Sequence, residues 1–114
     1  MVKRAKNCLV KKMQYYKKPF KSGQITIPKR IQTYLDFNEG EYLFIYVFKN
    51  WIEVVKQHHN KTLNQCIFGR GKISIPIELR RLLGITRTTL LKLQVDRNQD
   101  KLIIKVINQE QILK

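Results

Sequence analysis

The sequence of 114 residues carries 23 Lys and Arg against 8 Asp and Glu, which gives a formal net charge of +15 at pH 7. This excess goes well beyond what solubility requires of a small domain, so it favours a polyanionic partner. A lysine-rich solvated surface of a thermophile and docking on acidic lipid are the alternative explanations. The hydrophobic share of 43% excludes a disordered chain, and the length leaves room for one domain or two half-sized units that share a core.

The positive charge is concentrated towards the amino terminus. Residues 1–34 hold ten Lys and Arg, and the first acidic residue is Asp36. We expect residues 1–12 to form a basic extension ahead of the first structured element. No apolar run approaches the ~20 residues of a membrane span, and no apolar signal core follows the first lysines. The sequence therefore predicts a cytoplasmic protein without a membrane partner.

Two short strands are expected first. Residues 13–20, with paired tyrosines, form one candidate, and residues 25–27 form the other. In the second strand isoleucines alternate with a threonine between Gly23 and Pro28, which is the pattern of a half-buried strand. The glycine marks a turn or a bulge between the two strands.

A helix of about two turns is expected after the second strand. Pro28 suits the first helical position, and Ile31 with Leu35 would form the inward face. Asp36 stands where a left-handed glycine commonly ends a helix, so we expect this helix to close less regularly. Residues 42–48 and 52–55 then predict a β-hairpin.

The remainder of the chain repeats this order. A shift of 48 positions aligns residues 20–50 with residues 68–98, and many pairs are identical: Phe20/Phe68, Gly23/Gly71, Ile25/Ile73, Ile27/Ile75, Pro28/Pro76, Leu35/Leu83, Leu43/Leu91, Val47/Val95 and Asn50/Asn98. The chain therefore holds two copies of one unit, in residues 13–57 and 62–107, followed by a short tail at 108–114.

The second copy predicts the same elements as the first. Its helix would start at Pro76, face inward through three leucines and end at Gly84, a good left-handed cap. Those leucines are Leu79, Leu82 and Leu83. Its strands are expected at residues 63–68, 73–75, 90–95 and 102–107.

Neither unit can bury both hairpins under a two-turn helix, so we expect the two units to share one core. The fold class predicted is mostly β with short helices, in which two tandem β-β-α-β-β repeats form a pseudo-two-fold β-barrel. Linkage in one chain favours pairing within the chain, unless the linker at residues 58–61 is too short. The alternative is a homodimer in which the repeats pair between chains.

The second copy resembles a known family at residues 71–85, GKISIPIELRRLLGI, and the first copy resembles it more loosely in GQITIPKRIQTYLDF. The family is the AbrB/SpoVT/MazE group of swapped-hairpin transcription factors. The resemblance covers about residues 13–107 and implies a tandem member. Family members interleave hairpins into one barrel and bind DNA with basic residues near the first strands, the glycine turn and the helix.

Carried over by position, the resemblance assigns DNA contacts to Arg70 and Lys72 at the glycine turn and to Arg80 and Arg81 on the helix. The first copy has uncharged residues at the matching positions: Ser22, Gln24, Gln32 and Thr33. Basic residues lie close to those positions and complete the candidate interface: Lys17, Lys18, Lys21, Lys29 and Arg30. The second copy is therefore expected to dominate DNA binding.

The helix pattern agrees with this assignment, because Arg80 and Arg81 flank the expected inward leucines and should project outward to meet phosphate. The alternative is a solvated helix face with Glu78 as an ion-pair partner. Tyr15, Tyr16 and Trp51 could stack on bases, although aromatic residues in short strands more often pack in the core.

Cofactor and metal sites are not expected. Cys8 and Cys66 lack a Cys-x-x-Cys spacing, and His58 and His59 are adjacent in a linker rather than spaced as a zinc pair. The acidic residues are scattered and no glycine-rich phosphate loop appears, so an enzyme is not expected either.

Duplex DNA is the expected partner, and the expected function is that of a transcriptional regulator. A sequence-independent architectural DNA or RNA-binding protein is one alternative. An antitoxin is another, although the seven-residue tail contains a single acidic residue, Glu110.

Overall fold

A computed structural model describes residues 14–96 and 98–107 of the chain. The secondary structure follows the order expected from the repeat, with boundaries within a few residues of those expected. The elements are β1 (Gln14–Lys17), β2 (Gln24–Thr26), α2 (Lys29–Leu35), β3 (Tyr42–Phe48), β4 (Trp51–Val55), β5 (Gln65–Ile67), β6 (Lys72–Ser74), α3 (Ile77–Leu83), β7 (Leu91–Asp96) and β8 (Lys101–Val106). The mostly β character and the two short helices were both predicted.

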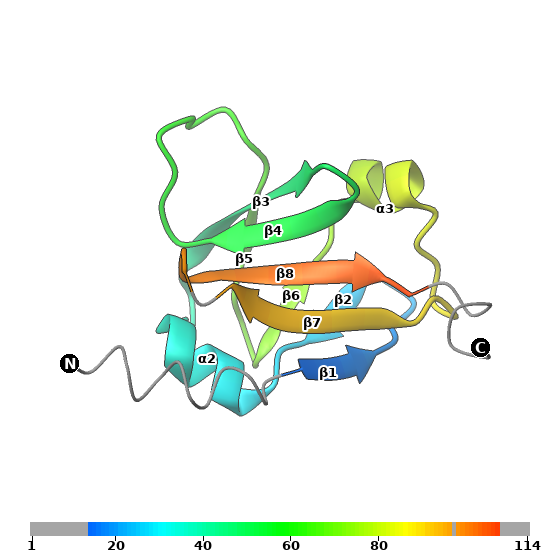
Figure 1. Cartoon of the computed structure of the whole chain (residues 1–114), viewed down its shortest axis with the longest axis horizontal. Coiled ribbons are helices and arrows are strands. Elements are labelled where there is room, and N and C mark those ends of the chain that lie inside the picture. The colour runs from blue at the N-terminus through cyan, green and yellow to red at the C-terminus, as the bar shows by residue number, and fades with distance from the viewer. Residues whose placement is uncertain (1–13, 97, 108–114) are drawn as a thin grey trace.

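The strands form two antiparallel layers. A six-stranded sheet has the order β1-β7-β8-β4-β3-β5, and a two-stranded ribbon pairs β2 with β6. Figure 1 shows the ribbon behind the larger sheet. The strands β1 and β5 form the two edges of the larger sheet, so the strand pairings of the described residues do not close into a barrel.

The leading strand of each copy crosses over to the other copy. β1 of the first copy pairs with β7 of the second, and β5 of the second copy pairs with β3 of the first. The strand order is therefore equivalent from either edge of the sheet: the leading strand of one copy comes first, followed by the hairpin of the other copy. Neither copy can complete its own part of the sheet, because each copy's hairpin is extended by a strand from the other copy.

The pairing registers locate a pseudo-two-fold axis. In the ribbon Ile25 lies opposite its repeat counterpart Ile73, a separation of 73 − 25 = 48 positions. In the larger sheet Glu53 lies opposite Ile103, a separation of 103 − 53 = 50 positions. The separation between equivalent residues of the two copies is two positions larger here, because the turn between β7 and β8 is two residues longer than the turn between β3 and β4.

The core lies between the two layers and draws on both copies. The ribbon contributes Ile25, Ile27, Ile73 and Ile75, each at most 1% exposed, and the larger sheet contributes residues such as Leu43, Ile52, Leu93 and Leu102. Two sheet layers must each bury one face, and only alternate residues of each strand point inward. One cluster of buried side chains thus joins the two copies.

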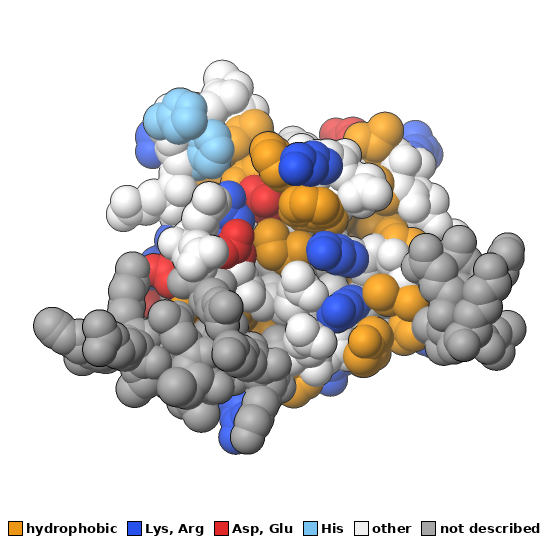
Figure 2. Space-filling model, viewed as in Figure 1, with side chains coloured by type: hydrophobic (Ala, Val, Ile, Leu, Met, Phe, Trp, Pro, Cys, Tyr) orange, Lys and Arg blue, Asp and Glu red, His pale blue; other side chains and the backbone are white. Residues whose placement is uncertain are grey.

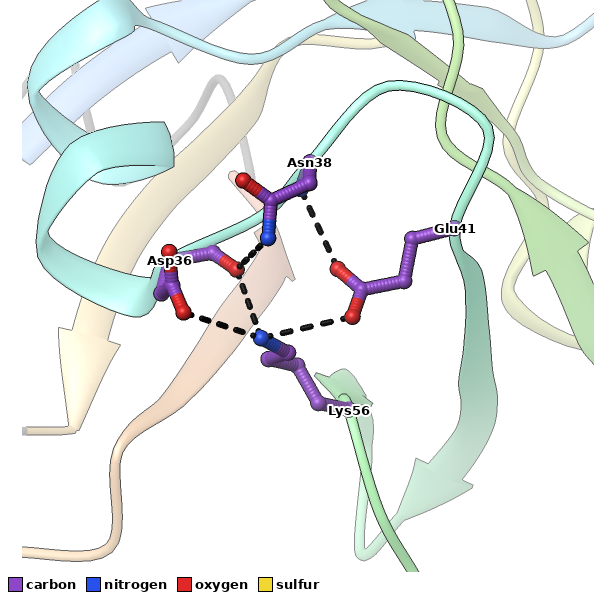
Figure 3. Close-up of polar contacts among 4 residues, drawn as sticks. All are labelled: Asp36, Asn38, Glu41 and Lys56. Atoms are coloured by element: carbon purple, nitrogen blue, oxygen red, sulfur yellow. Dashed lines mark hydrogen bonds and ion pairs between the residues drawn. The ribbon is translucent and has the colours of Figure 1, made fainter.

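Both helices close in the same way, which corrects the expectation of a less regular end after Leu35. Asp36 adopts the left-handed conformation, with φ 58°, as Gly84 does with φ 67°. The backbone carbonyl of Asp36 accepts hydrogen bonds from Lys56 Nζ at 2.8 Å and Asn38 Nδ2 at 3.0 Å, as Figure 3 shows. Lys56 also contacts carboxylate oxygens of Asp36 and Glu41. These contacts hold a non-glycine residue in a conformation that L-amino acids disfavour.

The inward face of α3 differs from the expected one. Leu79 is buried, but Leu82 is 68% exposed, so the prediction that Leu82 faces the core is wrong. Arg80, expected on the outer face, is half-buried. Each helical residue turns by about 100°, so Leu82 lies about 160° around the helix from Arg80, outside the arc that spans Leu79 and Arg80.

Among the described residues, no helix combines the length and the apolar composition needed to cross a lipid bilayer.

Candidate nucleic-acid interface

The β2–β6 ribbon presents a polar outer face. Its isoleucines point into the core, while Gln24, Thr26, Lys72 and Ser74 lie on the side away from the larger sheet. Gln24 pairs with Ser74, and Thr26 pairs with Lys72. The outward side chains therefore offer hydroxyl, amide and ammonium groups on a narrow two-stranded surface.

A tight turn connects β5 to β6 at one end of the ribbon. Gly69 and Lys72 exchange backbone hydrogen bonds of 3.0 and 2.9 Å across Arg70 and Gly71, both of which have positive φ. The Glu39 carboxylate accepts the backbone N–H groups of Arg70 and Gly71, the latter at 3.0 Å. These hydrogen bonds lower the pKa of the Glu39 carboxyl. The turn is therefore fixed, and the exposed Arg70 side chain extends from a rigid base.

At the other end of the ribbon, Arg80 packs on the turn of the first copy. Its Nε donates a 2.9 Å hydrogen bond to the carbonyl of Ile75. A side chain at Gly23 would collide with the guanidinium, because a Cβ there would lie 2.5 Å from Nε, and Gly23 has a φ of +83°. Arg80 thus joins α3 to the first copy's turn, which corrects the expectation that it projects freely from the helix.

Gln32 makes the equivalent contact in the first copy. Its Nε2 donates a 2.7 Å hydrogen bond to the carbonyl of Ile27 and lies against Gly71. Gln32 and Arg80 are repeat counterparts, since 80 − 32 = 48. The helix of each copy is therefore tied to the glycine turn of the other copy.

Because each helix contacts the glycine turn of the other copy, the predicted basic residues are divided between the two ends of the ribbon. At the end next to α2, the 2.8 Å bond from Ile27 N–H to Gly71 O brings the second turn against the start of α2. We call this the α2 end, and its basic residues are Arg70, Lys72, Lys29 and Arg30. Lys29 and Arg70 both lie near enough to Glu39 to lower its carboxyl pKa.

The opposite end, next to α3, combines Lys21 of the first turn with Arg80 and Arg81 of the second copy's helix. The 3.0 Å bond from Ile75 N–H to Gly23 O joins these two segments. We call this the α3 end. Lys21 and Arg81 are exposed. The basic positions of the second copy, expected to act together, are thus split between the α2 end and the α3 end.

The other predicted lysines belong to the edge of the larger sheet. Lys17 is the last residue of β1 and is half-buried, and Lys18 follows it and is exposed. They precede the first glycine turn along the chain.

Three residues that matter to this surface were not singled out from the sequence. Glu39 fixes the second turn, and Thr26 with Ser74 completes the outer face of the ribbon. The alternation in residues 25–27 and 73–75 implied that Thr26 and Ser74 point outward. Nothing in the sequence indicated the contact of Glu39, which depends on two segments more than 30 residues apart.

The other residues singled out from the sequence lie outside the ribbon and its two ends. Tyr15 packs against the core, whereas Tyr16 is 54% exposed and Trp51 is partly buried. Burial raises the pKa of the Cys66 thiol to about 12, so this thiol is unreactive. The part of the chain that the structure describes holds no group of three or more His, Cys, Asp or Glu suited to a metal ion. Cys8 lies outside that part.

No family model matches the chain, and no curated protein matches it. A solved structure with some similarity is the solution structure of PHS018 from Pyrococcus horikoshii, which is 14% identical. The similarity covers 83% of this chain and 91% of that chain, with a TM-score of 0.48.

Proposed function

We propose that this chain is a cytoplasmic duplex-DNA-binding protein that regulates transcription, built as a tandem member of the AbrB-like swapped-hairpin family. The observation that carries the proposal is the β2–β6 ribbon, whose polar outer face is flanked by basic residues at both the α2 end and the α3 end. The crossover of β1 and β5 between the copies supports the swapped-hairpin part of the proposal.

The ribbon has a suitable shape for the major groove. A B-DNA major groove is about 12 Å wide and admits a two-stranded β-ribbon. Amide, hydroxyl and ammonium groups at Gln24, Thr26, Lys72 and Ser74 match the donors and acceptors on base edges. Base contacts from this face would supply the sequence preference.

The two basic ends would contact phosphates on either side of the groove. Cations at both ends neutralise the backbone and fix the position of the ribbon, because phosphate contacts position a protein while base contacts specify the sequence. The pseudo-two-fold axis runs between Ile25 and Ile73. A bound site would therefore consist of two similar half-sites. They would not be identical, since Gln24 occupies the repeat position of Lys72.

The salt dependence of binding tests this proposal. We expect log affinity for random duplexes to fall against log salt with a slope of about −4 to −8, as for roughly five to nine neutralised phosphates. Lys29→Gln with Arg70→Gln at the α2 end, and Lys21→Gln with Arg81→Gln at the α3 end, should each reduce the magnitude of the slope by about one to two.

A matched control removes the same charge from the far layer. The pair Lys49→Gln with Lys92→Gln alters two lysines of the larger sheet and its hairpin, so the slope for duplex DNA should change little. A flat salt response of the parent protein, or equal effects of all three double variants, would exclude the ribbon as the DNA interface.

A further inference from the structure

The outer face of the larger sheet carries a continuous row of aromatic and basic side chains. Phe48 pairs with Trp51, Lys105 with Lys92, and Lys92 with Tyr16. Trp51 and Lys105 each lie one residue beyond the paired Ile52 and Ile104, and Lys105 Nζ lies over the Trp51 ring. We call these five residues the outer row. It crosses β3, β4, β8, β7 and β1 on the side away from the ribbon. Figure 2 shows lysine and hydrophobic side chains in a line across this face.

Two lysines of the outer row lie directly opposite each other without a compensating acid. Lys92 faces Lys105 across β7 and β8. Like charges at such a position destabilise a sheet. Within the described residues, the lysines that form ion pairs are Lys56 and Lys101, not these two. An anion bound between Lys92 and Lys105 would relieve the repulsion.

Two of the three aromatic members of the outer row are exposed, and the third, Trp51, is partly buried. Tyr16 is 54% exposed and Phe48 is 47% exposed, and the rings of Phe48 and Trp51 lie 5.8 Å apart. An antiparallel sheet can leave one face to solvent, but that face is then usually polar. Exposed rings in a line are the usual platform on which successive bases of a single strand stack.

A buried carboxylate fixes the central ring. Glu53 is 4% exposed and accepts a 3.0 Å hydrogen bond from Trp51 Nε1. Tyr46 OH and Lys101 Nζ each donate to it at 2.9 Å. The charge of Glu53 is thus neutralised by Lys101, and the indole is held in one orientation. A fixed ring loses little freedom when a base stacks on it.

Two lysines lie close to this ring. Lys105 Nζ lies 5.0 Å and Lys49 Nζ 5.8 Å from the centre of the Trp51 ring. Each ammonium sits on a flexible four-carbon stem. A base that stacks on Trp51 can therefore displace a lysine, which then reaches a phosphate of the same strand.

The surface beside the outer row is suited to base edges. A hollow of about 760 Å³ is lined by Trp51 together with four residues that carry carboxamide side chains: Gln14, Gln94, Asn98 and Gln99. Carboxamides donate and accept hydrogen bonds, as base edges do. Asp96 also lines the hollow, but its carboxylate accepts the backbone N–H of Asn98 at 2.9 Å and so serves the turn.

We propose that the outer row binds a single-stranded nucleic acid, with bases stacked on Trp51 and its neighbouring rings and phosphates held by Lys92 and Lys105. An acidic peptide would use the lysines but leave the rings and carboxamides without a role. This site lies on the opposite layer from the ribbon, so it does not depend on the proposed duplex-binding function.

Trp51 provides the signal for a direct test, because it is the single tryptophan of the chain. The full-length protein is titrated with oligo(dT) and oligo(U) of about 12 nucleotides, and with an abasic strand of equal length. Stacking predicts quenching of Trp51 emission by oligo(dT) or oligo(U), and much weaker quenching and binding by the abasic strand. The tighter of the two oligonucleotides identifies the preferred sugar. Equal binding and quenching by the abasic strand, or by polyglutamate, would overturn the proposal.

Variants measured by anisotropy of labelled oligonucleotide give a second, independent readout. Trp51→Leu should weaken single-strand binding by about 5- to 150-fold, and Trp51→Phe, which keeps an aromatic face, should weaken it less. Lys92→Gln with Lys105→Gln should weaken it without touching the ring. Lys29→Gln with Arg70→Gln, on the ribbon, is the matched control and should have little effect. If the ribbon pair weakens single-strand binding more than the outer-row pair does, the assigned face is wrong, whether or not duplex binding occurs.

Discussion

Arg80 and Gln32 occupy the same position in the two copies and make the same contact, although one is charged and the other is not. Each donates to the carbonyl at the end of its own copy's ribbon strand and packs on the other copy's glycine turn. The positive charge of Arg80 is therefore not needed for the contact. The shared geometry suggests a substitution that separates the structural part of Arg80 from its charge.

We predict that Arg80→Gln leaves stability within about 0.5 kcal/mol of the parent, because glutamine already makes this contact in the first copy. Arg80→Ala should cost about 1 to 2 kcal/mol, since it removes the hydrogen bond to Ile75 and the side chain that covers Gly23. Urea unfolding followed by circular dichroism measures both. Equal stability of the alanine variant and the parent would show that the contact contributes nothing.

Glu53 links stability to pH. Burial alone would raise the pKa of its carboxyl, but hydrogen bonds from Lys101, Trp51 and Tyr46 outweigh burial and hold the pKa below its ordinary value. Burial and the Glu53 carboxylate also raise the pKa of Tyr46 to about 12. The folded pKa of Glu53 is lower than the unfolded pKa, so its stabilising effect is complete above the unfolded value of about 4.3. That effect is lost as pH falls through the folded pKa.

We therefore predict that Glu53→Gln reduces the free energy of unfolding at neutral pH by about 1.5 to 3 kcal/mol, because Lys101 loses its charged partner. The loss should shrink as pH falls below about 4. Glu78→Gln, in the exposed first turn of α3, is the control and should reduce stability by less than about 1 kcal/mol. The prediction fails if the variant and the parent differ by the same amount at pH 7 and at pH 3.

At the scale of elements, the two helix ends show how different residues reach one conformation. Gly84 has no Cβ, and its carbonyl accepts a single long hydrogen bond of 3.5 Å, from Thr89 Oγ1. The carbonyl of Asp36 accepts two shorter ones, from Lys56 and Asn38. The sequence predicted the cap at Gly84, because glycine favours it. It could not predict the cap at Asp36, since Lys56 lies on a strand end 20 positions away.

We predict that Gly84→Ala costs about 1 kcal/mol or somewhat more, because a Cβ at a φ of +67° is strained even though no neighbouring atom crowds it. Gly69→Ala is the matched control: it too is uncrowded, but Gly69 is not among the residues with positive φ. Its cost should stay within about 0.5 kcal/mol. Thermal unfolding monitored by circular dichroism compares the two variants. Equal losses would rule out backbone strain as the cause.

Several elements could be predicted from local patterns, and the candidate site only in part. Glycine, alternating isoleucines and Ile-Pro predicted the ribbon strands and both helix starts, because these are local signals. The inward position of Arg80 and the exposure of Leu82 could not be predicted, since both depend on the first copy's turn packing against α3. The sequence likewise grouped Arg70 with Arg80, whereas the crossing of the copies places them at opposite ends of the ribbon.

At the scale of the whole molecule, the crossover makes the two copies one folding unit. β1 and β5 each complete a hairpin of the other copy, and the ribbon takes one strand from each. We predict that fragments cut near Asn60 are unfolded or self-associated when separate. Mixing the two fragments should restore the circular dichroism spectrum of the parent, because each supplies the missing strands. Sedimentation that shows a folded monomeric fragment would contradict a shared core.

The two layers of the molecule are proposed to bind different nucleic acids. The ribbon and its two basic ends would bind duplex DNA, and the outer row would bind a single strand. The two surfaces use different lysines and lie on opposite layers. Charge-neutral variants of one surface should therefore leave the ligand of the other surface bound.

Nuclear magnetic resonance can map the face of the protein that binds duplex DNA. Backbone amide shifts of the labelled protein are followed while a short random-sequence duplex is added. We expect the largest changes at the ribbon and its two turns, including Gln24, Thr26, Lys72 and Ser74, with Trp51 and Lys105 little affected. Changes confined to the outer row, or absent from the ribbon, would exclude the ribbon as the duplex-binding face.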